Sequence, residues 1–174
     1  VLDGGQSDVG IESTIVDLTR LATHGPVLLR PGGISTAELE RVLGCAMSTP
    51  DTAAPRVSGS LDAHYAPHTP VALVASSMLD EVLRHLAQKH RHVALMAWSE
   101  SSATRLAALT SLRMPADPQA YAHMLYAGLR ELDAERADII LVEQPPAAGA
   151  WQGVNDRLRR AAFDSTGVLD KLLA

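Results

Sequence analysis

The feature that most constrains the fold is an alternation of short apolar stretches with amphipathic stretches from Val71 onward. Apolar stretches at 71–75, 92–97 and 138–143, and another near Leu112, have the length and composition of buried strands. The stretch at 138–143 is apolar almost throughout, which is typical of a strand covered on both faces. Strands that alternate with helices are joined by right-handed crossovers and form a parallel sheet. The sequence therefore predicts an α/β unit after Val71.

The stretches between these strands have the period of helices. We expect helices over 78–89, 104–109, 118–134 and 154–163. The helix that follows Asp117 is the best signalled, because Asp117 and Pro118 form an N-cap and first-turn pair. Apolar residues then fall on one face of it, as expected of a helix packed against a sheet.

The first 44 residues have a different order: strand, turn, strand, turn and helix. Strands are expected at 13–18 and 26–30, which carry β-branched or apolar runs, and Pro31-Gly32-Gly33 ends the second. Ser35-Thr36-Ala37-Glu38 matches a capping box, in which the serine and glutamate side chains bond to backbone amides at a helix start. This signal predicts a helix that ends near Leu43.

Residues 45–70 show no periodicity. Serine, threonine, alanine, glycine and four prolines dominate them, as in an interdomain linker. A long segment of this kind is usually either disordered or functional. Because its end, Ser-Gly-Ser-Leu-Asp-Ala-His-Tyr-Ala-Pro, is chemically varied, we interpret the segment as functional.

Composition excludes several protein classes. Fifteen Lys and Arg against twenty Asp and Glu give a formal net charge of -5, which argues against a chain-wide surface for nucleic acid but leaves a local basic patch open. Aromatic residues make up 3%, so few side chains could stack on exposed bases. No apolar run approaches the roughly 20 residues that cross a membrane. The single cysteine, Cys45, cannot form an internal disulfide, and the sequence shows no charged-then-apolar leader segment, so we expect a reducing cytoplasm. The opening residue, Val1, is not Met and suggests that the chain starts inside an element of a longer protein.

Familiar cofactor and metal motifs are missing. Gly4-Gly5 and Gly32-Gly33 do not extend to a dinucleotide fingerprint, and no phosphate-binding Gly-x-x-x-x-Gly-Lys loop occurs. Ser58-Gly59-Ser60 lies in a proline-rich segment rather than in a strand-to-helix turn, which disfavours a serine hydrolase. His85 and His90 are not on one helical face and have no accompanying cysteine pair, so we predict no structural metal.

Three places carry candidate chemistry. Arg30 closes an apolar strand before Pro-Gly-Gly, where it either binds a ligand or forms a salt bridge at the strand end, and residue chemistry does not separate the two. Ser13 and Thr14 enter a strand, where hydroxyls satisfy local backbone more often than they contact a small polar ligand. His64-Tyr65 offers an imidazole and a phenol on a segment that could cover a pocket.

Four motifs in order along the chain resemble one family. They are Asp3-Gly4-Gly5, Gly10-Ile11-Glu12-Ser13-Thr14-Ile15-Val16-Asp17, Leu29-Arg30-Pro31-Gly32 and Ser58-Gly59-Ser60-Leu61-x-x-His64-Tyr65-Ala66-Pro67. Together they resemble the two-domain threonylcarbamoyl-AMP synthases over essentially the whole chain, and Asn155-Asp156-Arg157-Leu158 resembles that family's closing motif. The resemblance implies an α/β fold with the end of a YrdC-like catalytic domain at 1–44, a linker with His-Tyr-Ala-Pro at 45–70, and a small Rossmann-like accessory domain with a parallel sheet at 71–174.

The family also implies an activity and a set of ligands. Its members are nucleotidyltransferases that combine L-threonine, bicarbonate or CO2, and ATP into threonylcarbamoyl-adenylate and diphosphate, and downstream tRNA threonylcarbamoyl transferase proteins use the product. The resemblance implies ATP as a substrate with Mg2+, no tightly bound cofactor and no membrane partner, and it leaves direct tRNA contact open. Ser13 would contact threonine, Arg30 would bind nucleotide phosphate, and His64 and Tyr65 would cover the nucleotide.

This chain departs from the family pattern in one respect. The N-terminal two-thirds of the YrdC-like domain, with its Lys-x-Arg and Ser-x-Asn motifs, is missing, so we expect this polypeptide alone to be inactive. Strands cut from a sheet expose unpaired edges, whereas the domain from Val71 should fold alone. The alternative, from a different class, is a non-catalytic α/β binding or regulatory module.

Overall fold

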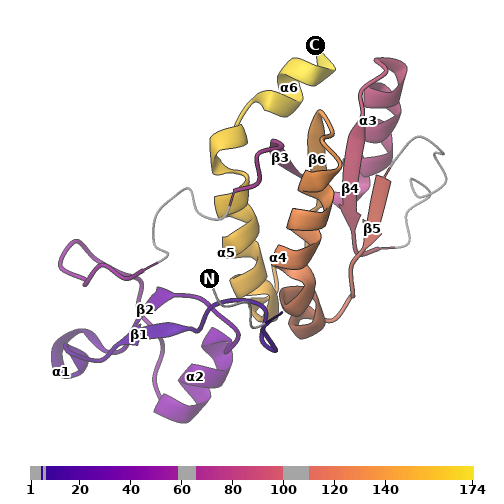
Figure 1. Cartoon of the computed structure of the whole chain (residues 1–174). Coiled ribbons are helices and arrows are strands. Elements are labelled where there is room, and N and C mark those ends of the chain that lie inside the picture. Colours follow the sequence, from indigo (N-terminus) through magenta and orange to yellow (C-terminus); the bar gives the residue numbers. More distant parts are fainter. Residues whose placement is uncertain (1–4, 6, 59–65, 100–109) are drawn as a thin grey trace.

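A computed structural model describes residues 5, 7–58, 66–99 and 110–174, whose helices and strands form two parts (Figure 1). The first part holds a two-stranded sheet and the second a four-stranded sheet. In Figure 1 the first part, in indigo and purple, lies beside the lower ends of α4 (Pro118–Ala134) and α5 (Gln152–Ala161) of the second. None of the helices in the described residues is long and apolar enough to span a membrane.

The first part is built on an antiparallel strand pair. β1 (Ile15–Asp17) and β2 (Val27–Arg30) lie side by side, with Ile15 opposite Arg30. Both predicted strands are present, and each is shorter than its prediction. One turn of helix, α1 (Leu21–His24), connects them and buries none of its residues. The sequence did not predict α1, because four residues are too few to show a helical period.

The predicted capping box starts α2 (Thr36–Leu43). The Ser35 hydroxyl accepts a hydrogen bond from the backbone N–H of Glu38, and the Glu38 carboxylate accepts one from the backbone N–H of Ser35. The helix ends at Gly44, whose φ of 71° is a left-handed conformation that glycine adopts without steric cost. Although α2 is amphipathic in sequence, it has no buried residue.

The start of the proline-rich segment stays attached to the first part. The backbone N–H of Leu28 donates to the carbonyl of Ser48, at 3.0 Å, and the N–H of Ser48 donates to the carbonyl of Pro26, at 2.8 Å. The Asp51 carboxylate accepts two hydrogen bonds from the Arg20 guanidinium, each of 2.9 Å. These contacts hold residues 45–51 beside β2 and α1.

The second part is a parallel sheet with the strand order β3-β6-β4-β5. Its strands are β3 (Val71–Val74), β4 (Val93–Ala97), β5 (Thr110–Arg113) and β6 (Ile139–Glu143). The central strands β4 and β6 are buried along their whole length, as expected of strands covered on both faces. The predicted α/β fold with a parallel sheet is therefore confirmed.

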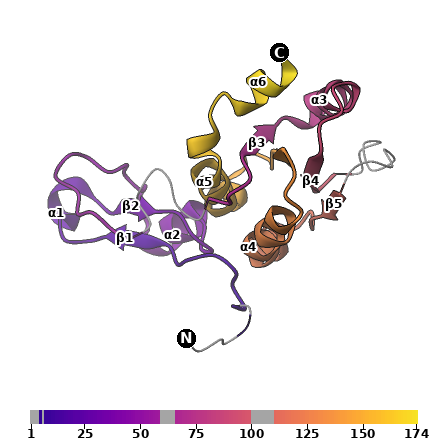
Figure 2. The same ribbon diagram turned by 45° about the horizontal axis from the view of Figure 1, so that its top comes forward.

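Helices cover both faces of this sheet (Figure 2). α3 (Ser76–Gln88) and α6 (Val168–Leu173) pack on one face, and α4 and α5 pack on the other, so that two separate apolar cores form. As predicted, Asp117 caps α4 and Pro118 occupies its first turn. The larger core, under α4 and α5, contains Tyr121 and Trp151, whose rings meet edge to face at 5.4 Å.

Three features of the second part differ from the sequence prediction or lie outside it. The predicted helix at 104–109 falls outside the described residues. The last predicted helix begins at Gln152, after a 3-10 turn, and Phe163 belongs to a second 3-10 turn. The short helix α6 was not predicted, because its six residues are only partly covered and give a weak periodic signal.

Candidate functional site

The structure brings together Ser13 and Arg30, which are 17 positions apart in the sequence. Arg30 ends β2, and its Nε and Nη2 donate to the backbone carbonyl of Ser13, at 3.2 Å and 3.0 Å. Nη2 also lies 3.5 Å from the Ser13 hydroxyl oxygen. Arg30 is buried, whereas Ser13 is exposed. Two of the candidate residues therefore form one local arrangement.

The remaining contact of Arg30 reaches the proline-rich segment. Its Nη1 donates to the carbonyl of Ser58, at 2.7 Å. Among the described residues no carboxylate pairs with Arg30, so the salt bridge considered from the sequence is not observed there. The guanidinium bonds to neutral carbonyl groups, which leaves its positive charge available to an anion.

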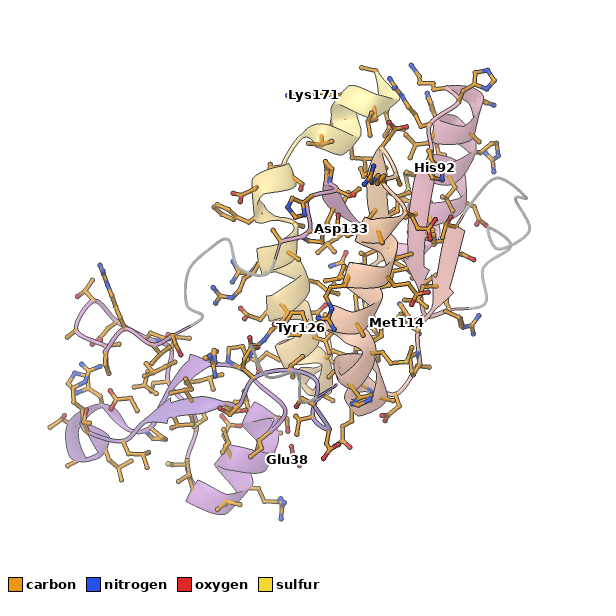
Figure 3. The ribbon with its side chains drawn as sticks, in the orientation of Figure 1. Glu38, His92, Met114, Tyr126, Asp133 and Lys171 are labelled. Carbon is orange, nitrogen blue, oxygen red and sulfur yellow. The ribbon has the colours of Figure 1, made fainter. Side chains whose placement is uncertain are left out.

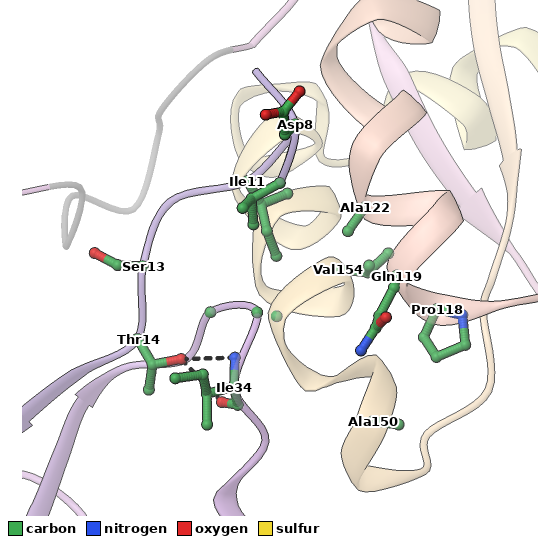
Figure 4. Close-up of a pocket in the computed structure, with 14 residues that line it drawn as sticks. Asp8, Ile11, Ser13, Thr14, Ile34, Pro118, Gln119, Ala122, Ala150 and Val154 are labelled. Carbon is green, nitrogen blue, oxygen red and sulfur yellow. Dashed lines mark hydrogen bonds between the residues drawn. The ribbon is translucent and has the colours of Figure 1, made fainter. Parts of the chain in front are cut away.

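Thr14 has the local backbone role that its residue type favours. Its hydroxyl donates to the carbonyl of Ile34, at 2.9 Å, and accepts from the N–H of the same residue, at 3.2 Å (Figure 4). The Ser13 side chain points the other way and makes no such bond. Of the two neighbouring hydroxyls, the one on Thr14 is therefore engaged by the Ile34 backbone and the one on Ser13 is not.

A pocket of about 510 Å³ lies between the first part and helices α4 and α5. It is lined by Ile11, Thr14, Gly33, Ile34, Gln119 and Val154, among others. In Figure 4 the Ser13 side chain points away from Gln119 on α4 and from Val154 on α5. Ser13 is itself one of the residues that line this pocket, although its side chain points away from those two helices.

The predicted residues His64 and Tyr65 lie outside the described residues, but contacts near both ends of their segment are described. Toward the N-terminus, Ser58 is held by the Arg30 contact. Toward the C-terminus, the Asp133 carboxylate on α4 accepts from the backbone N–H groups of Thr69, at 2.8 Å, and His68, at 3.2 Å. Burial acts to raise the pKa of Asp133, but these donors outweigh it and lower the pKa to about 2.

A buried carboxylate lies at the carboxyl edge of the parallel sheet, where α/β folds commonly bind ligands. Glu143, at the end of β6, is fully buried and accepts hydrogen bonds from the backbone N–H groups of Trp98 and Ser99, each at 2.9 Å, and from the Ser99 hydroxyl. Burial acts to raise the pKa of Glu143, but the Ser99 donors keep it below its ordinary value. Glu143 therefore links the two residues that follow β4 to the end of β6 by hydrogen bonds. No group of three or more potential metal ligands occurs within the described ranges.

Sequence reasoning missed the residues that join the two parts. The Glu12 carboxylate accepts from the Tyr126 hydroxyl on α4, at 3.1 Å, and from Arg157 Nε on α5, at 2.9 Å. Tyr126 and Asp133 lie two turns apart on α4 (Figure 3). Both Glu12 and Arg157 occur in recognised motifs, but their pairing spans 145 positions and has no local signal.

Comparisons with known proteins show which family this chain resembles. A family model described as the C-terminal domain of threonylcarbamoyl-AMP synthase matches residues 34–163. Threonylcarbamoyl-AMP synthases of Pyrococcus abyssi and Bacillus subtilis are each 32% identical to this chain, over 177 and 171 residues. Each match covers 93% of this chain and 48% of the relative, so the chain spans about half the length of the curated relatives it matches.

Two solved structures resemble the fold. One is P. abyssi Sua5 complexed with L-threonine, with a TM-score of 0.75 and 26% identity over 94% of this chain and 49% of that chain. The other is a variant of P. abyssi Sua5 in which a histidine and the tyrosine after it are replaced by alanine, with a TM-score of 0.70 and 27% identity. It covers 94% of this chain and 48% of that chain.

Proposed function

The chain belongs to the threonylcarbamoyl-AMP synthase family, whose C-terminal domain its residues match, and from this premise we propose that it forms part of a threonylcarbamoyl-AMP synthase. The proposed reaction is the nucleotidyl transfer that joins L-threonine, bicarbonate or CO2, and ATP into threonylcarbamoyl-adenylate and diphosphate. The observation that carries the proposal is the contact between Ser13 and Arg30, which puts a hydroxyl and an arginine charge side by side. Downstream tRNA threonylcarbamoyl transferase proteins would consume the product.

Ser13 is the proposed contact to L-threonine. Its hydroxyl is exposed, and the carbonyl of the same residue is held by Arg30, which fixes the position of the residue. A hydroxyl can both donate to and accept from the polar groups of an amino acid. The P. abyssi relative has a structure in complex with L-threonine, which supports this choice of substrate.

Arg30 is the proposed contact to a nucleotide phosphate. Its guanidinium has no carboxylate partner within the described part of the chain, and a planar fork of N–H donors matches the oxygens of a phosphoryl group. ATP would enter as a substrate with Mg2+, and no tightly bound cofactor is proposed. Because diphosphate leaves during the reaction, a cation beside the phosphates would stabilise the charge that develops.

His64 and Tyr65 are proposed to cover the nucleotide, which would shield a labile adenylate from water. They form the only His-Tyr pair of the chain, and a consecutive histidine and tyrosine were replaced in one of the two similar structures. In this scheme residues 1–44 end the catalytic domain, 45–70 form the linker and 71–174 form the accessory domain. The single cysteine is exposed, which fits a reaction carried out in a reducing cytoplasm.

The proposed function is tested by diphosphate release from ATP in the presence of L-threonine and bicarbonate. We expect activity from the complete polypeptide that contains this chain and none from the 174-residue chain alone. Omission of threonine or of bicarbonate should abolish the release, which controls for simple ATP hydrolysis. A silent complete polypeptide would contradict the enzyme and favour a binding or regulatory module, while an active 174-residue chain would contradict the proposed inactivity of this portion.

The Arg30→Ala variant of the complete polypeptide separates the phosphate role from a structural one. We expect activity to fall about 100-fold or more, because loss of one group that stabilises developing charge has an effect of this order. The free energy of unfolding should change by no more than about 3 kcal/mol, the effect of lost buried hydrogen bonds. Loss of folding in proportion to the loss of activity would support the structural role instead.

A further inference from the structure

Arg157 joins the two parts of the molecule. It lies on α5, is 4% exposed, and extends its guanidinium into the first part. Its Nε donates to the Glu12 carboxylate at 2.9 Å, and its Nη2 donates to the backbone carbonyl of Glu12 at 3.3 Å. Its Nη1 donates to the backbone carbonyl of Pro31. One side chain of the second part therefore binds two separate loops of the first.

These two loops are the ones that carry the candidate site. Glu12 directly precedes Ser13, and Pro31 directly follows Arg30. The consecutive carbonyls of Glu12 and Ser13 are bound by different arginines, the first by Arg157 and the second by Arg30. Because the carbonyls of both residues have hydrogen-bond partners, the backbone that carries the Ser13 side chain is held from two sides.

The Glu12 side chain strengthens this connection. Its carboxylate accepts from Arg157 and from the Tyr126 hydroxyl, so both α4 and α5 hold it. Burial acts to raise the pKa of Glu12, but its own backbone N–H and the Arg157 guanidinium outweigh this effect and keep the pKa below its ordinary value. The Glu12 carboxylate is therefore ionised at neutral pH, and removal of the Arg157 guanidinium would leave it without its cationic partner in a partly buried place.

The backbone of α5 packs closely against the loop after β2, so the two parts have no free space between them at this point. A Cβ atom added to Gly153, one turn before Arg157 on α5, would lie 2.5 Å from the carbonyl oxygen of Gly32. A Cβ atom added to Gly32 would in turn lie 2.2 Å from the backbone nitrogen of Thr14. Close-packed atoms of this kind transmit a displacement instead of absorbing it. A shift of α5 would therefore move the backbone at Ser13.

We propose that Arg157 is a positioning residue for the threonine site: from the accessory domain, it fixes the backbone on which Ser13 presents its hydroxyl to the substrate. The inference rests on the proposed function, because it takes Ser13 as the threonine contact. It gives the accessory domain a part in substrate binding without any contact between that domain and the substrate. The ATP contact depends less on Arg157, because Arg30 is also held by the carbonyl of Ser58, which is not among the hydrogen-bond partners of Arg157 within the described residues.

The test compares Arg157→Lys with Arg159→Lys in the complete polypeptide. Lysine keeps the positive charge but cannot span Glu12 and Pro31 with one planar group. Arg159 is a matched control, because it lies on the same helix and pairs with Asp156, as Arg157 does, but its guanidinium is exposed. The measurements are KM for threonine, KM for ATP and kcat, together with the threonine Kd by calorimetry.

For Arg157→Lys we expect KM and Kd for threonine to rise about 10-fold or more, since displacements near 1 Å at a site can cost up to about 100-fold. KM for ATP should rise less than about 3-fold, and Arg159→Lys should leave all three constants within about 2-fold. Unchanged threonine constants in a folded Arg157→Lys protein would overturn the inference. The inference would also be overturned if KM for threonine and KM for ATP rose equally and the unfolding midpoint fell. That pattern is expected of a residue with a purely structural role.

A second variant covers the case in which Arg157→Lys does not fold. Tyr126→Phe removes one donor to the Glu12 carboxylate and leaves the charge pair, so KM for threonine should rise by about 2- to 5-fold, less than in Arg157→Lys. No change in that constant would overturn the inference. A wild-type complete polypeptide that binds no threonine at all would instead contradict the proposed function, and the inference with it.

Discussion

The two parts of the molecule bury their side chains very differently. In the second part, two apolar cores enclose the strands of the sheet, and β4 and β6 are buried throughout. In the first part, neither α1 nor α2 buries any residue. Within the described ranges eight large hydrophobic residues are exposed, and six of them belong to the first part: Val9, Leu18, Leu21, Ile34, Val42 and Leu43. The candidate site residues thus lie on the part with the smaller core, and their geometry depends on contacts with the better packed part.

The largest effect that would test this contrast is expected inside the sheet. Leu95, at the centre of β4, is fully buried, and Leu95→Ala should lower the free energy of unfolding by about 2–5 kcal/mol, because the lost contacts leave a cavity. Val42→Ala on α2 is the matched truncation, because Val42 is 77% exposed, and it should change stability by less than about 0.5 kcal/mol. Urea denaturation measures both variants. Equal losses would show that the two parts are packed alike and would refute the contrast.

A smaller effect is expected at the junction. Gly153→Ala would drive a Cβ atom into the carbonyl of Gly32 and should weaken the contact between the parts by about 1–3 kcal/mol, as overpacking does. Limited proteolysis should then cleave residues 7–58 faster. Gly149→Ala is the control, because a Cβ atom there meets nothing within 4 Å. If Gly153→Ala were cleaved at the control rate, the junction would not be the rigid contact described above.

The smallest effect is expected at Asp133, which binds the C-terminal end of the proline-rich segment, and it is a dependence of the unfolding free energy on pH. The pKa of Asp133 is about 2 in the folded chain, below its ordinary value of 3.8, so its stabilising contribution is complete above about pH 4 and is lost as the pH falls toward 2. The difference in unfolding free energy between the wild type and Asp133→Asn should therefore shrink over that range. A difference that stays constant with pH would show that the carboxylate charge does not hold Thr69 and His68.

Local signals predicted elements of both parts well. The apolar run of β6, the cap formed by Asp117 and Pro118, and the capping box of Ser35 each depend on neighbouring residues, and all three are present in the structure. The first strand is shorter than predicted, since β1 spans only Ile15–Asp17, and its pairing with β2 is irregular between Ile15 and Val16. Propensity alone does not encode where a strand finds its partner.

The candidate site could be predicted only in part. The motifs indicated Ser13 and Arg30 as chemically interesting, but the bonds of Arg30 to the carbonyls of Ser13 and Ser58 depend on the folded path of the chain. The pairing of Glu12 with Arg157 joins residues 145 positions apart, and no periodicity relates them. Such a contact follows from the packing of the two parts against each other, which a single sequence does not show.

The most direct test of the account is a calorimetric titration of L-threonine into the complete polypeptide and its Ser13→Ala variant. Ser111→Ala, which removes an exposed hydroxyl from β5, is the matched control. The account predicts that Ser13→Ala weakens threonine binding about 10-fold or more, the effect of one lost hydrogen bond to a charged group, and that the control binds like the wild type. Wild-type affinity in Ser13→Ala would contradict the claim that the junction between the two parts presents this hydroxyl to the substrate.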